Sequence, residues 1–252
     1  MNIELEAWKA SYDEQGYILV RDAVKEIPQF EKLLDGSEEK FFEKDDVTLR
    51  SVYGFHKNPL FLKWLSESSL IKQIVVSLLG EEVYLHQCKV NIKNRDESSV
   101  WPFHRDYPFW KVFDHFPKND FLNVVVYLDD VFEGSGELKL IPCSHMEFLD
   151  REAMDELTDY SLEGSASSDL LFSFSEDEIT YFKKKFGVFK TIAQKGSVLL
   201  FDPNLIHGSD RSVLDFSRKI LILTFNKCMN RPSEISQRPN YLCNSDNTPL
   251  KW

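Results

Sequence analysis

The chain has 252 residues, of which 42 % are hydrophobic and 13 % aromatic, with 20 phenylalanines and a formal net charge of −11. This composition is typical of a globular protein with a large core and excludes a disordered chain. The acidic balance, without any basic block, argues against a nucleic-acid-binding surface and against binding to anionic membranes.

The cysteines and the first residues of the chain predict a reduced, cytoplasmic setting. Cys88, Cys143, Cys228 and Cys243 are scattered and form no CxxC pair, as is usual for a cytosolic protein. The opening segment, MNIELEAWKASYDEQGY, carries acids where a secretory signal would have basic residues followed by an apolar run. No window approaches the roughly 18 apolar residues of a membrane span.

The first part of the chain, residues 1–80, is predicted to be mainly helical. Apolar residues at helical spacing predict a helix over residues 3–15, and GYILVRDAV (16–24) is typical of a short buried strand. Residues 28–45 are charged and look helical. The segment NPLFLKWLSESSLIKQIVVSLLG (58–80) predicts two helical segments, with its final glycine as the C-terminal cap.

Residues 81–228 form a run of predicted strands separated by turns such as EGSG. The strand-like segments are EEVYLHQCKVNIK, FLNVVVYLDDV, GELKLIPCSH, GSVLLFDPNLIHGSD and RKILILTFNKC. A helical part followed by strands predicts an α+β chain built on an antiparallel barrel or jelly roll. We expect a single domain over residues 1–252, with residues 229–252 as a C-terminal tail.

An acidic insertion, residues 146–186, interrupts the predicted strands. The helix-like stretches DREAMDEL and EDEITYFKKKF flank the segment EGSASSD. Such a segment is either a solvated surface insertion or a lid over an active site, because long loops on rigid scaffolds often carry function. The sequence leaves both interpretations open.

The stretch WPFHRDYPFW contains a candidate pair of metal ligands, His104 and Asp106. With 6 histidines and 41 acidic residues, about one His-x-Asp/Glu pattern arises by chance, and His145 with Glu147 forms a second. On a strand, residues two apart point to the same face, so His104 and Asp106 could meet one ion. The alternative is two polar residues in an aromatic-rich strand.

A third ligand candidate, His207, follows an apolar strand and a turn. Two histidines and one carboxylate form the facial triad that suits non-haem Fe(II), although zinc can use the same ligand types. Arg218 lies eleven residues after His207 and would be a buried guanidinium able to grip a carboxylate in bidentate fashion. The alternative is that Arg218 pairs with a structural acid such as Asp202 or Asp215.

The segments FHRD and FDPNLIHGSDRSVLDFSR resemble the Fe(II)/2-oxoglutarate dioxygenases of the phytanoyl-CoA hydroxylase superfamily. The resemblance is closest to the ectoine hydroxylase branch in LRSVYGFHKNP, EEVYLHQCKVNIK, GELKLIPCSH and FDPNLIHGS, and it runs from about residue 50 to residue 226. It implies a double-stranded β-helix (jelly roll), iron on His104, Asp106 and His207, and the far carboxylate of 2-oxoglutarate on Arg218.

The resemblance also implies roles on the cosubstrate side. Asn91 and Ser209 match residues that help to bind 2-oxoglutarate. A cosubstrate-side Ser of the branch falls in NVVVY, where Asn123 is the near polar candidate. The alternative for Asn91 is a strand residue that faces solvent.

On the substrate side, Gln87 matches a substrate-binding Gln, and Trp110 and Phe201 match aromatic residues that embrace the substrate. Lys89 replaces an Arg of the branch and would attract an acidic group, although it could equally point to solvent. Gln87 could also face solvent, and Trp110 and Phe201 could be plain core. The branch carries an acid just before its Trp and a His just after it, whereas the sequence here reads YPFWKV, which puts ectoine itself in doubt as the substrate.

The remaining histidines are not expected to bind the metal. The segment LIPCSH resembles a strand end of the family whose His is not a ligand, so His145 and Glu147 are expected at the surface or in hydrogen bonds. His56, His86 and His115 are also predicted to be non-ligands, although His56 and His86 could line the mouth of the pocket.

The resemblance implies an enzyme that uses Fe(II), 2-oxoglutarate and O2 to hydroxylate an unactivated C–H of a small polar substrate, amino-acid-like or a natural product, releasing succinate and CO2. Asp106 favours hydroxylation because related halogenases lack this carboxylate, although desaturation and ring closure use the same triad. We expect a small-molecule substrate, no nucleic acid or membrane partner, and a monomer or homodimer. The alternatives are an inactive jelly-roll protein that binds metal or a 2-oxo acid, and a zinc hydrolase with the same three ligands.

Overall fold

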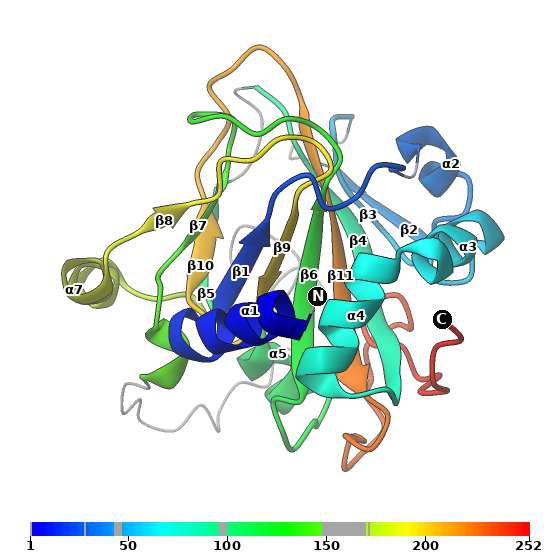
Figure 1. Cartoon of the computed structure of the whole chain (residues 1–252). Coiled ribbons are helices and arrows are strands. Elements are labelled where there is room, and N and C mark those ends of the chain that lie inside the picture. Colours follow the sequence, from blue (N-terminus) through cyan, green and yellow to red (C-terminus); the bar gives the residue numbers. More distant parts are fainter. Residues whose placement is uncertain (1, 28, 43–46, 96–99, 148–169, 171) are drawn as a thin grey trace.

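Two antiparallel sheets form the core of the protein in the computed structural model, which describes residues 2–27, 29–42, 47–95, 100–147, 170 and 172–252 (Figure 1). The larger sheet contains, in spatial order, β1 (Tyr17–Val20), β9 (Val198–Phe201), β6 (Phe121–Tyr127), β11 (Arg218–Lys227), β4 (Val83–Lys93), β3 (Leu49–Tyr53) and β2 (Glu39–Phe42). The smaller sheet contains β5 (Trp101–His104), β10 (His207–Ser209), β7 (Leu138–Leu140) and β8 (Phe189–Lys190). The predicted α+β jelly-roll class is confirmed.

The helices α1 (Asn2–Gln15) and α4 (Ser69–Leu79) cover one face of the larger sheet (Figure 1). The main hydrophobic cluster lies between them, where Ile74 of α4 packs with Leu221 and Val124 of the sheet. Strand β6 is buried along its whole length, as its unbroken apolar sequence predicts. Of the described helices, none is both long and apolar enough to cross a bilayer.

The two helices predicted over residues 58–80 are confirmed as α3 (Pro59–Glu67) and α4. The side chain of Asn58 caps α3 by accepting from the N–H groups of Leu60 and Phe61, and Pro59 occupies the first helical position. Gly80 ends α4 with a φ of 92°, a backbone conformation that glycine adopts without strain.

The predicted helix over residues 28–45 is wrong for most of the part that the structure describes, residues 29–42. A helix, α2, covers Phe30–Leu34, whereas Glu39–Phe42 forms strand β2, which pairs with β3. The ring of Phe41 packs edge-on against Tyr53 with centroids 5.2 Å apart. This cross-strand contact and the ladder to β3 outweigh the helical preference of the charged neighbours, so the first third is less helical than predicted.

The structure describes part of the predicted insertion 146–186. The short helix η1 (Ser144–Met146) ends at its first residue, and EDEITYFKKKF forms helix α7 (Glu176–Phe186), as predicted. Ser175 and Glu178 form a reciprocal capping box at the start of α7. The stretches DREAMDEL and EGSASSD lie outside the described residues, so the choice between a lid and a surface insertion stays a prediction.

The pairing of β4 with β11 builds one wall of a cavity between the two sheets. Arg218 pairs with Lys93 at one end of this ladder, and Thr224 pairs with Gln87 towards the other. Because side chains alternate along a strand, every second residue of both strands faces the cavity. The residues that line it from these two strands are Gln87, Lys89, Asn91, Lys93, Arg218, Ile220, Ile222 and Thr224.

Candidate active site

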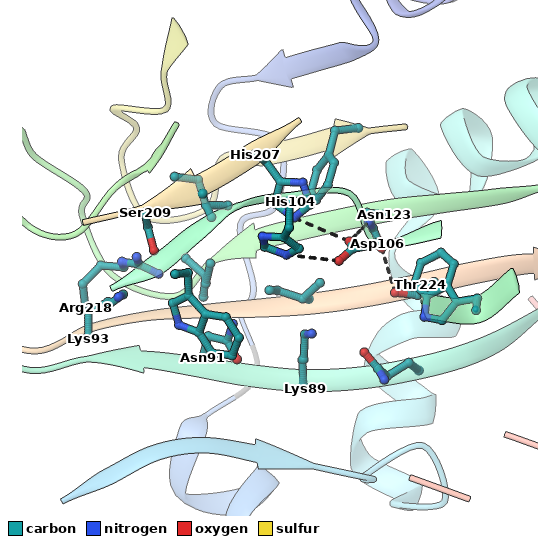
Figure 2. A pocket seen from close by; sticks show the side chains of 18 residues that line it. Lys89, Asn91, Lys93, His104, Asp106, Asn123, His207, Ser209, Arg218 and Thr224 are labelled. Carbon is teal, nitrogen blue, oxygen red and sulfur yellow. Dashed lines mark hydrogen bonds and ion pairs between the residues drawn. The ribbon is translucent and has the colours of Figure 1, made fainter. Parts of the chain in front are cut away.

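Three predicted metal ligands, His104, Asp106 and His207, converge in the cavity between the sheets (Figure 2). One ligand atom from each lies within 4.8 Å of the other two. His104 and His207 are direct partners in the pairing of β5 with β10, and their ring centroids are 4.3 Å apart. The carboxylate of Asp106 lies 3.5 Å from His104 Nε2 and 3.6 Å from His207 Nε2.

The local structure that brings Asp106 to the histidines is a turn and not a strand. Strand β5 ends at His104, and Asp106 has helical dihedral angles of −79° and −41° at the start of helix α5 (Tyr107–Phe113). Its backbone N–H donates to the carbonyl of Pro203 at 2.9 Å. The prediction that two residues on one strand face share the metal was therefore wrong in its geometry, although the ligands do meet. The stretch YPFW belongs to α5.

Hydrogen bonds direct the free nitrogen of each imidazole towards Asp106. Nδ1 of His104 lies 2.7 Å from the carbonyl oxygen of Pro102, and Nδ1 of His207 lies 2.9 Å from that of Leu205. Because a carbonyl only accepts, each Nδ1 carries the hydrogen and each Nε2 keeps its lone pair.

The ionisation of the ligands also suits a cation. Burial lowers the pKa of His207 to about 4, so this imidazole is neutral at neutral pH. Burial acts to raise the pKa of Asp106, but His207, His104 and Lys89 outweigh it and hold the pKa well below its usual range. A neutral imidazole at His207 and an ionised carboxylate at Asp106 are donors of the facial-triad type, so these residues fit an Fe(II) ion.

A second group with ligand-type side chains, His86, Asp114 and Cys243, does not fit a metal ion. Arg238 donates to both carboxylate oxygens of Asp114, from Nε at 2.8 Å and from a terminal nitrogen. Burial raises the pKa of the Cys243 thiol to about 12, so it stays protonated at neutral pH. The guanidinium already neutralises the carboxylate, and a protonated thiol is a weak ligand.

The second His-x-Glu pattern lies outside the site. His145 Nε2 is 3.3 Å from the carbonyl oxygen of Asp13, and Glu147 accepts from the hydroxyl of Tyr181 at 2.6 Å and pairs with Lys185. These contacts agree with the expected surface and hydrogen-bonding roles of His145 and Glu147.

Arg218 closes the opposite end of the cavity (Figure 2). It is 2 % exposed and donates to the carbonyl oxygen of Gly136, while its Nε has no hydrogen-bond partner among the described residues. Burial lowers its pKa to about 10, which leaves it protonated at neutral pH. A buried guanidinium with an unused donor fits a ligand carboxylate.

The structural acids that could have paired with Arg218 have other partners. Asp202 accepts from the side chain of Asn119 at 2.8 Å, and Asp215 pairs with Arg95 at 3.2 Å. The alternative of an internal ion pair at Arg218 is therefore not realised with either acid.

Ser209 and Asn91 line the cavity near Arg218, as the resemblance implied (Figure 2). The Oδ1 atom of Asn91 is buried and lacks a hydrogen-bond partner within the described part of the chain. Lys93, which is 2 % exposed, lines the same end and was missed by the sequence reasoning. The alternation from Gln87 through Asn91 could have identified it, because Lys93 occupies the next position on the same face.

The predicted substrate-side residues Gln87, Lys89, Trp110 and Phe201 all line the cavity. Gln87 is 6 % exposed and donates to the carbonyl oxygen of Leu242 at 3.0 Å, so it does not face solvent. Trp110 and Phe201 also belong to buried hydrophobic clusters. Both residues are therefore part of the core and also line the cavity, so the two alternatives for them, a core residue and a residue that faces the substrate, do not exclude each other.

A further group of residues extends the cavity beyond the metal ligands and was not predicted. Tyr53 of β3 and the C-terminal residues Arg238 and Leu242 line this part together with Lys89 and Trp110. The ammonium group of Lys89 lies 5.5 Å from the ring centroid of Tyr53. The C-terminal tail therefore forms part of the site, although the sequence resemblance ends before it.

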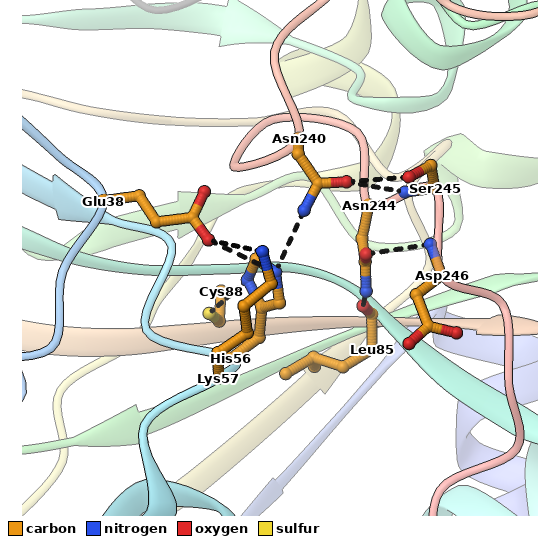
Figure 3. A network of polar contacts seen from close by, with 9 residues as sticks. All are labelled: Glu38, His56, Lys57, Leu85, Cys88, Asn240, Asn244, Ser245 and Asp246. Atoms are coloured by element: carbon orange, nitrogen blue, oxygen red, sulfur yellow. Dashed lines mark hydrogen bonds and ion pairs between the residues drawn. The ribbon is translucent and has the colours of Figure 1, made fainter.

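Hydrogen bonds hold the tail against β4 and the loop after β3 (Figure 3). Asn240 Nδ2 donates to His56 Nε2 at 3.3 Å, and Asn244 Nδ2 donates to the carbonyl oxygen of Leu85 at 2.8 Å. The possibility that His56 and His86 line the pocket mouth is not realised, because neither lines the cavity that holds the three candidate ligands. His56 lines a separate groove beside the tail, and His86 lies behind Trp110 with ring centroids 5.4 Å apart.

Comparisons with known proteins agree with this geometry. The family model "Phytanoyl-CoA dioxygenase (PhyH)" matches residues 12–220. L-proline trans-4-hydroxylase from Streptomyces griseoviridis is 30 % identical over 217 residues, which cover 84 % of this chain and 80 % of that protein. Ectoine dioxygenase from Nocardia farcinica is 27 % identical over 256 residues, covering 96 % and 85 % respectively.

Solved structures show the same fold. The crystal structure of EctD from S. alaskensis with bound Fe superposes with a TM-score of 0.76 at 24 % identity, over 96 % of this chain and 84 % of that one. The 2-oxoglutarate-dependent epimerase SnoN superposes with a TM-score of 0.64 at 16 % identity, over 100 % and 97 %. The chain belongs to the phytanoyl-CoA dioxygenase family and is a dioxygenase that uses iron, 2-oxoglutarate and oxygen.

Proposed function

We propose that the chain hydroxylates an unactivated C–H of a small, carboxylate-bearing substrate of amino-acid type. The observation that carries this proposal is a single cavity with His104, Asp106 and His207 in its middle and the buried Arg218 at one end. When bound, iron activates oxygen and couples the conversion of 2-oxoglutarate to succinate and CO2 with oxidation of a substrate C–H.

Arg218 would bind the far carboxylate of 2-oxoglutarate, with Ser209 and Asn91 as further hydrogen-bonding partners and Lys93 as a second cation. All of them line the same end of the cavity. The buried guanidinium of Arg218 favours a dicarboxylate, because the anion replaces water that the guanidinium has lost on burial. The same residues fix the direction in which the 2-oxo-acid end points, towards the three metal ligands.

Lys89 would bind an acidic group of the substrate on the other side of the metal ligands. It lines the cavity together with His104, Asp106 and Trp110. The nearby Arg238 is already neutralised by Asp114, so among the described residues that line this part of the cavity Lys89 is the cation available to a substrate anion. Trp110 and Phe201 would hold the apolar part of the substrate and exclude water from it.

The related hydroxylases act on compounds of the proposed size. One relative is named for L-proline and another for ectoine, and the EctD structure from S. alaskensis was also solved with 2-oxoglutarate and 5-hydroxyectoine. Their names support a small polar substrate. The choice among such compounds would be made by Lys89, Gln87 and the tail residues Arg238 and Leu242, which border the substrate side.

Substrate-stimulated release of succinate tests this proposal. We expect carboxylate-bearing compounds of amino-acid type such as L-proline to stimulate release, and neutral L-prolinamide to fail. Lys89→Met should raise KM for the accepted substrate at least about tenfold, because a charge-assisted hydrogen bond contributes about 1.5–3 kcal/mol.

A matched variant on the same side of the protein controls for the loss of a positive charge. Lys111 is exposed on α5, so Lys111→Met should leave KM unchanged. Equal stimulation by L-proline and L-prolinamide, or an unchanged KM in Lys89→Met, would contradict the anion-binding role of Lys89.

A further inference from the structure

The carboxylate of Asp106 is held by a side chain from the opposite sheet. Asn123 Nδ2 donates to Asp106 Oδ2 at 2.6 Å (Figure 2). An Asp at the start of a helix usually caps that helix through its side chain. Asp106 stands at the start of α5, but its side chain makes no capping hydrogen bond to the helix. The carboxylate is therefore oriented by Asn123, a neutral donor that brings no counter-charge to it.

The amide of Asn123 is in turn oriented by Thr224. The two residues are direct partners in the pairing of β6 with β11, and Thr224 Oγ1 donates to Asn123 Oδ1 at 2.8 Å. A side-chain amide can present either its oxygen or its NH2 group to a neighbour. Asp106 only accepts hydrogen bonds, and the hydroxyl of Thr224 supplies the hydrogen for Oδ1, so both contacts favour the same orientation.

The three side chains form a chain of hydrogen bonds, and its two inner members have little access to bulk water. Asn123 is 1 % exposed and Thr224 is 2 % exposed. Hydrogen bonds are stronger in such surroundings than in water, and a partner left alone is costly. Rotation of the Asp106 carboxylate would break its bond to the amide and leave a buried donor unpaired.

We infer that Thr224 and Asn123 form a positioning relay that holds the Asp106 carboxylate ready for iron. The inference rests on the proposed iron site and gives Asn123 a different role from the cosubstrate-side one that the resemblance implied. Both residues act through Asp106. Outer partners of this kind typically change metal affinity or activity by about 10–100-fold.

Anaerobic titration of the metal-free protein with Fe(II) tests the relay without relying on turnover. We expect Asn123→Leu to weaken Fe(II) binding about 10–100-fold. Thr224→Val should weaken it by a smaller factor, and Thr224→Ser, which keeps the hydroxyl, should bind Fe(II) like the wild type. The double variant Asn123→Leu/Thr224→Val should bind no more weakly than Asn123→Leu, because the hydroxyl acts only through the amide.

The Tm of each metal-free variant separates positioning from packing. A Thr224→Val variant that loses thermal stability but binds Fe(II) like the wild type would overturn the relay, as would additive losses in the double variant. If Asn123→Leu does not fold, the comparison of Thr224→Val with Thr224→Ser carries the test. A wild type that binds no Fe(II) contradicts the proposed iron site, whereas equal binding by wild type and Asn123→Leu contradicts the relay alone.

Discussion

Replacing His207 by alanine is expected to abolish tight Fe(II) binding and, with it, 2-oxoglutarate turnover. His207 supplies one of two imidazole nitrogens that face Asp106 in a buried site. The remaining His104 and Asp106 provide too few donors to hold the ion in competition with water. The loss in Fe(II) affinity should exceed the roughly 10–100-fold that removal of an outer partner causes, as measured by anaerobic calorimetric titration.

His145→Ala is the matched control for this experiment. His145 belongs to the other His-x-acid pattern and contacts the backbone of Asp13. Its replacement should leave Fe(II) affinity at the wild-type level. Wild-type affinity in His207→Ala, or an equal loss in both variants, would show that the metal is bound elsewhere.

Replacing Arg218 by alanine is expected to raise KM for 2-oxoglutarate by about 30-fold or more while Fe(II) stays bound. The guanidinium is buried and its Nε lacks a partner in the described residues, so it can meet a ligand carboxylate without losing an internal ion pair. Removing one member of a buried charged pair costs about 2–5 kcal/mol, and about 1.4 kcal/mol corresponds to tenfold. Steady-state succinate release over a range of 2-oxoglutarate concentrations gives this KM.

A 2-oxo acid without the second carboxylate sharpens this test. With 2-oxobutyrate, Arg218→Ala should change KM far less than with 2-oxoglutarate. This compound has no far carboxylate, so neither the wild type nor the variant makes the contact between that carboxylate and residue 218. Arg218→Lys, which retains charge but loses the fork, should fall between wild type and Arg218→Ala. Arg211 is exposed, and Arg211→Ala should leave KM unchanged. An equal effect of Arg218→Ala on both 2-oxo acids would contradict its role as the anchor.

The three candidate metal ligands could be picked out from the sequence because the His-x-Asp pattern, the distal His207 and Arg218 together resemble one family. His104 and Asp106 are joined by a short turn, and His207 follows an apolar strand that crosses the core. The shape of that turn was not predictable from alternation alone. The aromatic run after Asp106 looked strand-like, but Tyr107–Phe113 forms a helix whose buried face packs into an aromatic cluster. Burial of these aromatic side chains against the rest of the protein favours the helix over the strand.

Residues that enter the site through long-range pairing were harder to predict. Lys93 lies beside Arg218 because β4 pairs with β11 over a separation of more than a hundred residues. Arg238 and Leu242 reach the cavity because the tail is fastened to β4 and the loop after β3 through Asn240 and Asn244. No local pattern encodes such contacts. Strands β2 and β3 were missed for a similar reason, since each is short and depends on its partner.

Optical absorption of the anaerobic protein after addition of Fe(II) and 2-oxoglutarate tests the central claim most directly. We expect a weak charge-transfer band in the visible region for wild type, no band with zinc in place of iron, and no band in His207→Ala. At low 2-oxoglutarate concentration, Arg218→Ala should show the band only weakly, and saturating 2-oxoglutarate should restore it. Absence of the band in wild type, with both Fe(II) and 2-oxoglutarate in excess, would contradict a site in which iron and 2-oxoglutarate bind together.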